Sequence, residues 1–264
     1  MRYQIQRFER RFLLGGILAL MPILWHIMIV VIPAAHNLNT TSVDTTAITE
    51  WIGFTQHLKY VYIYYLALPF VCSLGVNQTT VEDYRSGFIA HFVFHRSVSR
   101  YWASSQIMSF LSGFLIAAVP IAIDLLATFI SLPALTPDWM INQLITLPKL
   151  TYFSTLYYEH PFLLIFIYIG MSGVLGGLAA MVSSTVGLFT KRSIVAISSP
   201  LIICLGMAFL TTLSPRYFFD PTTVTIAFSP DYLPPIERLV QVTIGVVVMV
   251  WLLGIWRIRK IAKL

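Results

Sequence analysis

Charged side chains are scarce in this sequence. Only 11% of its 264 residues are Asp, Glu, Lys or Arg, whereas 57% are hydrophobic and 14% aromatic, and the mean hydropathy is +0.79. Soluble globular domains contain about 25% charged and about 45 to 50% apolar residues. The composition excludes an ordinary soluble domain and predicts a membrane protein.

Cysteine is also scarce. The two cysteines, Cys72 and Cys204, both fall inside apolar stretches, so neither lies in an external loop where an oxidising compartment would pair it. We interpret them as small packing residues.

Several catalytic motifs are missing. The phosphate-binding pattern G-x-x-x-x-G-K-[ST] does not occur, so this chain cannot hold ATP by that device. No G-x-S-x-G is present to supply a nucleophilic serine. His91 and His95 have the spacing of a metalloprotease pair, but no glutamate lies between them and no third ligand is evident, so we interpret them as interfacial side chains. We therefore expect no catalytic residue, no metal and no cofactor in this chain.

Long apolar stretches are what the sequence has in abundance. About 20 apolar residues span a bilayer as a helix, because each residue rises ~1.5 Å and the hydrocarbon core is ~30 Å thick. Six stretches approach that length and predict an all-α polytopic membrane protein, a single domain over residues 1–264 with six transmembrane helices. The first stretch is longer than a signal-peptide core, so we expect it to be a helix of the domain. The stretches are 12–32, 59–76, 102–130, 161–188, 194–213 and 239–256.

The basic residues predict the orientation, because cytoplasmic flanks collect Lys and Arg. Only Lys59, Lys149, Arg216 and Arg238 of the 17 basic residues fall on one side of the predicted spans. The remaining basic residues fall on the side of the two termini. We therefore expect a multi-pass protein of the cell membrane with both termini in the cytoplasm. This bias, with attraction to anionic membrane lipids, explains the net charge of +6, and we expect no nucleic-acid partner.

Two segments outside the spans have a membrane-like pattern. Ile5, Phe8 and Phe12 share one narrow helical stripe while the arginines of the same segment point the other way. This pattern predicts an amphipathic interfacial helix at the N-terminus, the alternative being a disordered basic tail. The loop 214–238, between spans 5 and 6, is about half apolar, and we expect it to be partly re-entrant.

The fourth stretch contains two pairs of small residues at helical spacing. Gly173 and Gly177 form G-x-x-x-G, and Ser172 and Gly176 form a second pair. Small residues let helix backbones approach closely. We favour packing within one subunit over a subunit interface.

Three residues inside the predicted spans are candidates for a substrate path. His26 and Asp124 are ionisable, and such groups within a span are functional suspects because burying charge in lipid is costly. Pro120 precedes Asp124 by four residues and loosens the helix there. Either these residues shape an outward-facing opening, or Asp124 reaches the interface or caps a neighbour.

The segment 81–102, VEDYRSGFIAHFVFHRSVSRYW, concentrates charge between two apolar stretches. The opening Asp83-Tyr-Arg-Ser-Gly87, the apolar run after it and the turn Ser97-Val-Ser-Arg100 resemble the cytoplasmic loop between spans 2 and 3 of ABC-2-type permeases. In that family an acid and a glycine open the loop, and a Pro-x-Ser-Arg-like turn leads into span 3.

The sequence departs from the family pattern at three positions. Phe88 stands in place of the usual threonine, and Ser97 and Gln106 replace the usual proline and lysine. The resemblance otherwise extends to the whole plan of six spans with both termini inside.

The resemblance implies a coupling helix between spans 2 and 3. Family members are dimers of permeases, identical or not, each docked on a separate ATPase subunit that binds ATP and Mg. The loop presses into a groove on that subunit. The alternative is a short amphipathic helix that only rests on the membrane. The residues that would contact the ATPase subunit are Glu82, Asp83, Arg85, Gly87, Phe88, Phe92, Arg96 and Arg100.

The function implied by the resemblance is that of the permease subunit of an ATP-driven exporter. Its expected substrates are amphipathic or hydrophobic peptides of the bacteriocin or lantibiotic kind, and its expected partners are ATPase subunits, a second permease chain and membrane lipids. Export of a lipid, a polysaccharide precursor or a drug is the alternative within the family. A membrane scaffold or an intramembrane enzyme without an ATPase is the alternative from another class.

Overall fold

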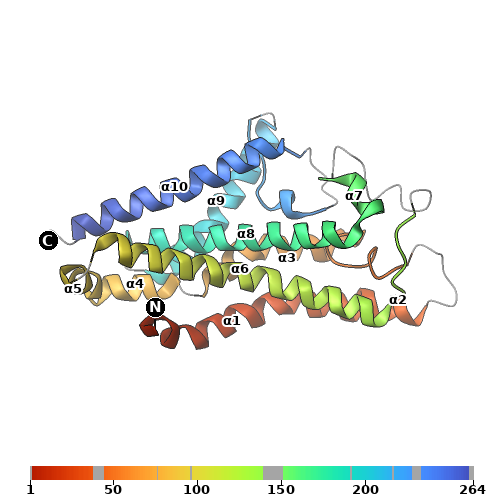
Figure 1. Ribbon diagram of the computed structural model, residues 1–264, viewed down its shortest axis with the longest axis horizontal. Helices are drawn as coiled ribbons and strands as arrows, with labels where there is room; N and C mark the ends of the chain where they lie inside the picture. Colours follow the sequence, from red (N-terminus) through yellow and green to blue (C-terminus); the bar gives the residue numbers. More distant parts are fainter. Residues whose placement is uncertain are drawn as a thin grey trace.

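The computed structural model describes residues 2–37, 45–75, 77–95, 97–138, 151–190, 192–215, 217–227 and 233–261. Every regular element within these residues is helical, and the long helices lie side by side along the longest axis (Figure 1). A π-helical turn, Ile27–Val31, joins α1 to α2, and the 3-10 turn η3 spans Thr223–Thr225. The helices are α1 (Arg2–His26), α2 (Ile32–His36), α3 (Leu58–Ser73), α4 (Asn77–Arg85), α5 (Phe88–His95), α6 (Val98–Ser131), α7 (Ser154–Glu159), α8 (Pro161–Gly187), α9 (Ser193–Leu213) and α10 (Ile236–Ile261).

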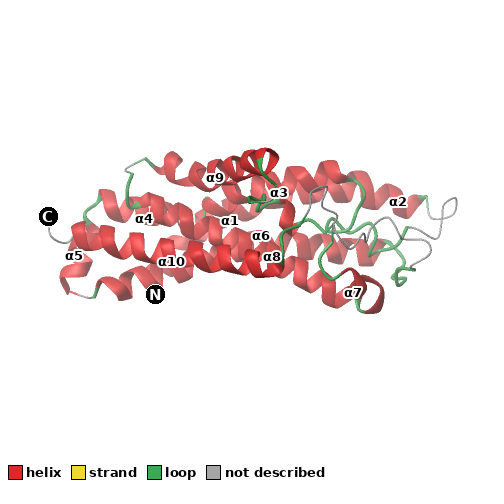
Figure 2. Ribbon diagram, turned by 90° about the horizontal axis from the view of Figure 1, so that it is seen from above, coloured by secondary structure: helices red, strands yellow, loops and turns green. Residues whose placement is uncertain are grey.

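The bundle has two distinct ends. Helices α4 and α5 lie at one end, and both chain termini lie toward it, whereas α2 and α7 lie at the other (Figures 1 and 2). We name the first the hairpin end, because α4 and α5 form a helical hairpin there, and the second the loop end. The placement of both termini at one end agrees with the even number of crossings expected from the sequence.

Five helical stretches of the described chain are long and apolar enough to cross a membrane. They lie within a few residues of five of the six predicted spans. The chain is therefore all-helical in its described regular structure and built as a polytopic membrane protein. The stretches are Phe12–His36, Val98–Ser131, Pro161–Gly187, Ser193–Leu213 and Ile236–Ile261.

The predicted second span differs from the structure. Instead of one helix over 59–76, α3 ends at Ser73 and a separate helix, α4, begins at Asn77. The 16 residues of α3 extend only about 24 Å. Pro69 removes one backbone donor inside α3, and the hydroxyl of Ser73 donates to the Pro69 carbonyl at 2.7 Å. Six long spans are therefore not confirmed, because the predicted second span is a short apolar helix followed by a break.

The N-terminal segment also differs from the expected plan. Residues 2–11 continue directly into the first span as one helix, α1. A separate interfacial helix is therefore not confirmed. The helix continues through residues 2–11 because no proline or glycine occurs before Gly15 to end it.

The centre of the bundle is the contact between α6 and α8. A Cβ added to Gly113 would overlap the Gly176 carbonyl oxygen, and the Cys72 sulfur packs on Gly176. Gly173 and Gly177 lie against the rings of two α6 phenylalanines. These contacts confirm that the small-residue pattern packs helices within one chain, and that Cys72 is a packing residue.

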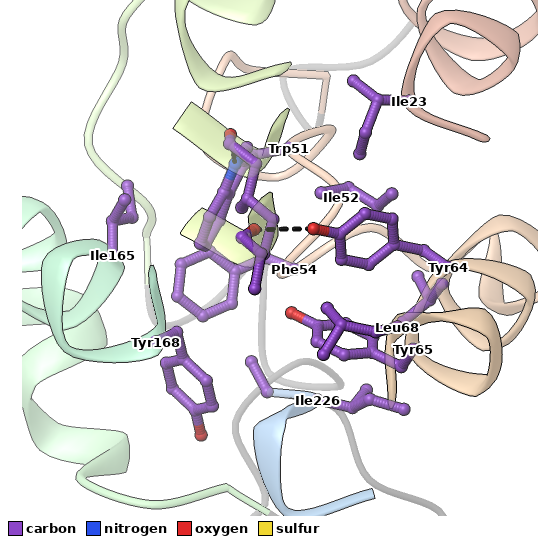
Figure 3. Close-up of a cluster of buried hydrophobic side chains, with 14 of the residues drawn as sticks. Ile23, Trp51, Ile52, Phe54, Tyr64, Tyr65, Leu68, Ile165, Tyr168 and Ile226 are labelled. Carbon is purple, nitrogen blue, oxygen red and sulfur yellow. Dashed lines mark hydrogen bonds between the residues drawn. The ribbon is translucent and has the colours of Figure 1, made fainter. Parts of the chain in front are cut away.

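The segment 45–57, which precedes α3, folds inward at the loop end. Trp51, Ile52 and Phe54, which precede α3, are buried in the same cluster as Tyr65 and Tyr168 (Figure 3). This segment, 45–57, contains no long helix but is almost entirely buried.

The described part of the predicted re-entrant segment, 217–227, folds back onto the bundle. Phe219, Val224 and Ile226 are buried, and Thr151 donates to the carbonyl of Ala227 at 2.8 Å. Figure 1 shows this segment beside α8 and α10. Burial against the bundle accounts for the apolar side chains of Phe219, Val224 and Ile226.

Candidate functional site

A helical hairpin, formed by α4 and α5, connects α3 to α6. Gly87 lies between the two helices with a φ of 72°, in the left-handed region that side chains with a Cβ disfavour. Its amide follows the last turn of α4, so glycine ends that helix and lets the chain reverse. The sequence therefore places a sharp, glycine-dependent turn at the position where the family pattern has its glycine.

The first attachment of the hairpin is a buried carboxylate. Asp83 on α4 is only 4% exposed, and its Oδ2 accepts a hydrogen bond from the Tyr101 hydroxyl at 3.1 Å. Tyr101 lies in the first turns of α6. Asp83 therefore faces its own chain rather than solvent, and it ties α4 to α6.

The second attachment involves an arginine near the C-terminus. The guanidinium of Arg257 on α10 donates to the Tyr84 hydroxyl at 3.0 Å and to the Leu188 carbonyl at 3.2 Å. It also lies 5.7 Å from the Tyr84 ring centroid and 5.4 Å from that of Phe189, within the range of a cation–π contact. Arg257 thereby joins the hairpin, the end of α8 and α10.

The aromatic stripe of the hairpin packs inward. Phe88 and Phe92 are half-buried, with ring centroids 5.8 Å apart, and Phe92 lies 5.4 Å from the Tyr101 ring. Both belong to a cluster that includes Ile89 of α5 and Ile258 of α10. The phenylalanines therefore hold α5 on the bundle, where the sequence predicted a docking face.

The turn of the hairpin is its solvent-facing part. Arg85, Gly87 and His91 are exposed, as is Arg100 at the start of α6, and Glu82 is half-buried. Arg96 and the side chain of His95 lie outside the described residues. No group of three or more His, Cys, Asp or Glu side chains that could hold a metal occurs within the part of the chain that the structure describes.

A polar seam, which the sequence patterns did not indicate, lies between α4, α6 and α8. Thr80 shares hydrogen bonds with Ser184 at 3.0 Å and Ser105 at 3.4 Å, and Gln106 donates to Ser184 at 3.3 Å. Gln106 is buried and its partner here is neutral. A lysine ammonium, usual at this position in the family, would need a compensating charge here, and the Gln106 Oε1 itself has no hydrogen-bond partner among the described residues.

The second candidate site is a buried His–Asp pair toward the loop end. His26 of α1 and Asp124 of α6 are both fully buried, with Nδ1 of His26 2.8 Å from Oδ1 of Asp124. The other carboxylate oxygen accepts the backbone N–H of Ile52 at 2.8 Å. Asp124 thus joins two helices to the inward-folded loop 45–57.

The helix around Pro120 receives two further hydrogen bonds. Trp51 donates to the Ile121 carbonyl at 3.2 Å, and Tyr64 donates to the Ala117 carbonyl at 2.6 Å, the bond drawn in Figure 3. Proline in a membrane helix is tolerated where neighbours satisfy the backbone groups it disturbs. Trp51 and Ile52 thus bind the loop to α6 at Ile121 and Asp124, which favours the interpretation that Asp124 caps a neighbour over an outward-facing opening.

The other face of His26 is apolar. Its Nε2 has no hydrogen-bond partner among the described residues, and the Tyr60 ring lies 5.8 Å from the imidazole centroid. Within this part of the chain no hydroxyl or thiol is bonded to Nε2. The π-helical turn Ile27–Val31 follows His26 directly. Such turns are often found at functional positions in helices.

Tyr152, which lies outside the spans, joins two segments at the loop end. Tyr152 donates through its hydroxyl to the carbonyl of Pro234 at 2.5 Å. Burial raises the pKa of Tyr152 to about 12, so the phenol stays protonated near neutral pH and remains a donor. This bond joins the segment before α7 to the segment before α10.

No protein-family model, curated protein or solved structure matches this chain. Its function therefore has to be argued from its own residues.

Proposed function

We propose that this chain is the membrane-spanning permease subunit of an ATP-driven exporter of the ABC-2 type. The observation that carries the proposal is the α4–α5 hairpin, which projects an exposed turn at the end of the bundle where both termini lie (Figure 1). The distribution of Lys and Arg supports a cytoplasmic location for that end, with the chain in the cell membrane. A coupling element that contacts an ATPase subunit has to lie there.

The attachments of the hairpin support a mechanical role. Asp83 bonds to α6 and Tyr84 bonds to Arg257 of α10, so a displacement of the hairpin is passed to two long helices. Energetic coupling between distant sites is carried by such packed and hydrogen-bonded contacts. A helix resting on the membrane surface does not need bonds of this kind to two spans.

The docking surface in this proposal is smaller than the sequence predicted. It comprises the exposed turn at Arg85 and Gly87, with Glu82 and Arg100 at its edge. Phe88 and Phe92 support the turn from behind. The ATPase subunit supplies ATP and Mg, and a second permease chain completes the transport path.

The first experiment tests the contact with the ATPase subunit. The single change Arg85→Glu reverses a charge on the turn and leaves both Gly87 and the half-buried phenylalanines unaltered. Because arginine anchors carry much of the energy of an interface, we expect at least about a tenfold loss of the co-purified ATPase subunit. The measurement is affinity purification from native membranes, with detection of a separate chain that carries G-x-x-x-x-G-K-[ST] and hydrolyses ATP.

Arg192→Glu is the matched control, because Arg192 is exposed in the turn between α8 and α9. It makes the same charge change outside the hairpin and should leave co-purification unchanged. Undiminished co-purification with the hairpin variant would refute the coupling assignment.

The second experiment concerns the cargo, for which we propose amphipathic peptides. ATP hydrolysis by the complex in liposomes should rise severalfold with a cationic amphipathic peptide, since cargo binding favours the transport-competent state. A response to added lipids, with none to peptides, would instead support lipid export. The readout is phosphate release at fixed complex concentration, with a non-amphipathic peptide of equal charge as the control.

A further inference from the structure

A cavity of about 380 Å³ lies between the middle parts of α8 and α9 and the first half of α10. Val174 and Leu178 of α8, Cys204 of α9 and Val242 of α10 line it, and Val224 of the inward-folded segment closes it toward the loop end. Figure 1 shows this segment in the space between α8 and α10. The cavity is separate from both the hairpin and the His26–Asp124 pair.

The lining is almost wholly apolar. Among the described residues that form it, none is charged, and hydroxyl groups come only from two threonines, Thr225 and Thr243. Cys204 is 8% exposed. A polar or ionic ligand would find too few partners for its own groups, so the lining chemistry selects a hydrocarbon.

The position of the cavity along the helices places it at acyl-chain depth. Val242 lies six residues after the start of α10 and Cys204 eleven residues after the start of α9, about 9 Å and about 17 Å along their axes. Both distances fall within a hydrocarbon layer of ~30 Å.

The cavity is also accessible from the side. Ile203 and Val242 line it and are 51% and 38% exposed, so its rim reaches the outer faces of α9 and α10. Those faces carry other exposed apolar residues, including Phe209 and Ile244, as expected of surfaces that contact lipid.

The shape of the cavity favours a narrow occupant. A helix from a second copy, ~10 Å wide with its side chains, needs a groove open along its length. A hydrocarbon chain is a single methylene wide and can enter between side chains.

We propose that this cavity is a binding site for one acyl chain of a membrane phospholipid. The acyl chain enters between α9 and α10 and packs beneath the segment that contains Val224. Bound there, it fills the space between α8 and α10 and supports the inward fold of residues 217–227. The proposal does not depend on the exporter function.

The test uses the full chain in phosphatidylcholine vesicles that contain a small fraction of phosphatidylcholine with a diazirine on one acyl chain. After illumination, adducts are mapped by mass spectrometry. We expect them to concentrate on 170–182 and 239–246 and to saturate as the labelled fraction rises. Val242→Trp, which fills the cavity, should reduce these adducts at least threefold.

Val247→Trp is the matched control, because Val247 lies on the same helix with 37% exposure against 38% for Val242 and does not line the cavity. It should leave the adduct map unchanged. Leu178→Trp fills the cavity from α8 and replaces Val242→Trp if that variant does not fold.

Three outcomes would overturn the proposal. Adducts spread evenly over exposed helix faces would show only general contact with the bilayer. Equal adduct maps for the two α10 variants would show that the cavity does not hold the acyl chain. Loss of a dimer in Val242→Trp, with unchanged lipid adducts, would identify the cavity as an interface between copies.

Discussion

Replacing Asp124 with leucine is expected to lower the free energy of unfolding by about 3 to 5 kcal/mol, the range found when one partner of a buried charged pair is removed. The leucine leaves two buried donors without an acceptor, Nδ1–H of His26 and the backbone N–H of Ile52, which now bond to the carboxylate at 2.8 Å each. Leucine fills a similar volume, so the loss reflects these bonds rather than a cavity.

The more conservative change Asp124→Asn should cost less, about 1 to 2 kcal/mol. The amide oxygen can still accept the Ile52 N–H, and the amide group can donate to Nδ1 of His26 if the imidazole proton moves to Nε2. That nitrogen already has no partner among the described residues. The asparagine variant therefore leaves Nε2–H and the second amide N–H unpaired but keeps one hydrogen bond to His26 and one to Ile52, both of which the leucine variant loses.

The measurement is thermal unfolding in detergent, followed by a thiol-reactive dye that reports exposure of the buried Cys72. The leucine variant should unfold about 10 °C below the wild type. Hydrogen exchange at residues 45–57 should rise in the leucine variant and change little in the asparagine variant.

Glu159→Gln is the control, since it removes an exposed carboxylate and should leave the unfolding temperature unchanged. If Asp124→Leu behaves like Glu159→Gln, the His–Asp pair does not anchor the loop and its burial has another role.

The membrane-spanning helices could be predicted because their cause is local. A continuous apolar run is matched to the thickness of the bilayer, and Pro161–Gly187 follows the predicted 161–188 closely. The break after Ser73 could not be read in the same way. Pro69 is compatible with a continuous membrane helix when neighbours satisfy the backbone, so the sequence alone does not say whether the helix continues.

The candidate site was predicted only in part, because its bonds join residues far apart in the sequence. His26 and Asp124 were each suspect as ionisable residues in a span, but their pairing across 98 positions leaves no periodic signal. Arg257 was predicted only as a cytoplasmic charge, although it bonds to Tyr84, 173 positions earlier. The direction of Phe88 and Phe92 depends on that packing of α10 and was likewise not predictable.

Gly113→Ala is expected to destabilise the bundle although it adds only a methyl group. The added Cβ would overlap the Gly176 carbonyl oxygen and would lie 2.7 Å from the Ala180 Cβ. Helices α6 and α8 must therefore separate, and overpacking of this kind costs about 1 to 3 kcal/mol or more. Alanine gains about 1 kcal/mol over glycine in a helix, which offsets only part of that cost.

Gly245→Ala adds the same methyl group to another helical glycine and is expected to have the opposite effect on stability. Nothing lies within 4 Å of a Cβ added at Gly245 in α10, so only the helix-propensity gain remains and the protein should become slightly more stable. Thermal unfolding should order the proteins as Gly245→Ala, wild type, Gly113→Ala, from most to least stable. An equal effect of the two substitutions would contradict the close approach of α6 and α8.

The double variant Gly113→Ala with Gly176→Ala distinguishes a shared contact from two separate ones. A Cβ at Gly176 would lie 2.6 Å from the Gly113 carbonyl oxygen, so each methyl group forces apart the same pair of backbones. One separation relieves both of these clashes, although the Gly176 methyl group would still meet the Cys72 sulfur of α3 at 2.8 Å. The double variant should therefore lose less stability than the sum of the single variants. Additive losses would mean that the two glycines meet independent obstacles and that α6 and α8 do not move as rigid neighbours.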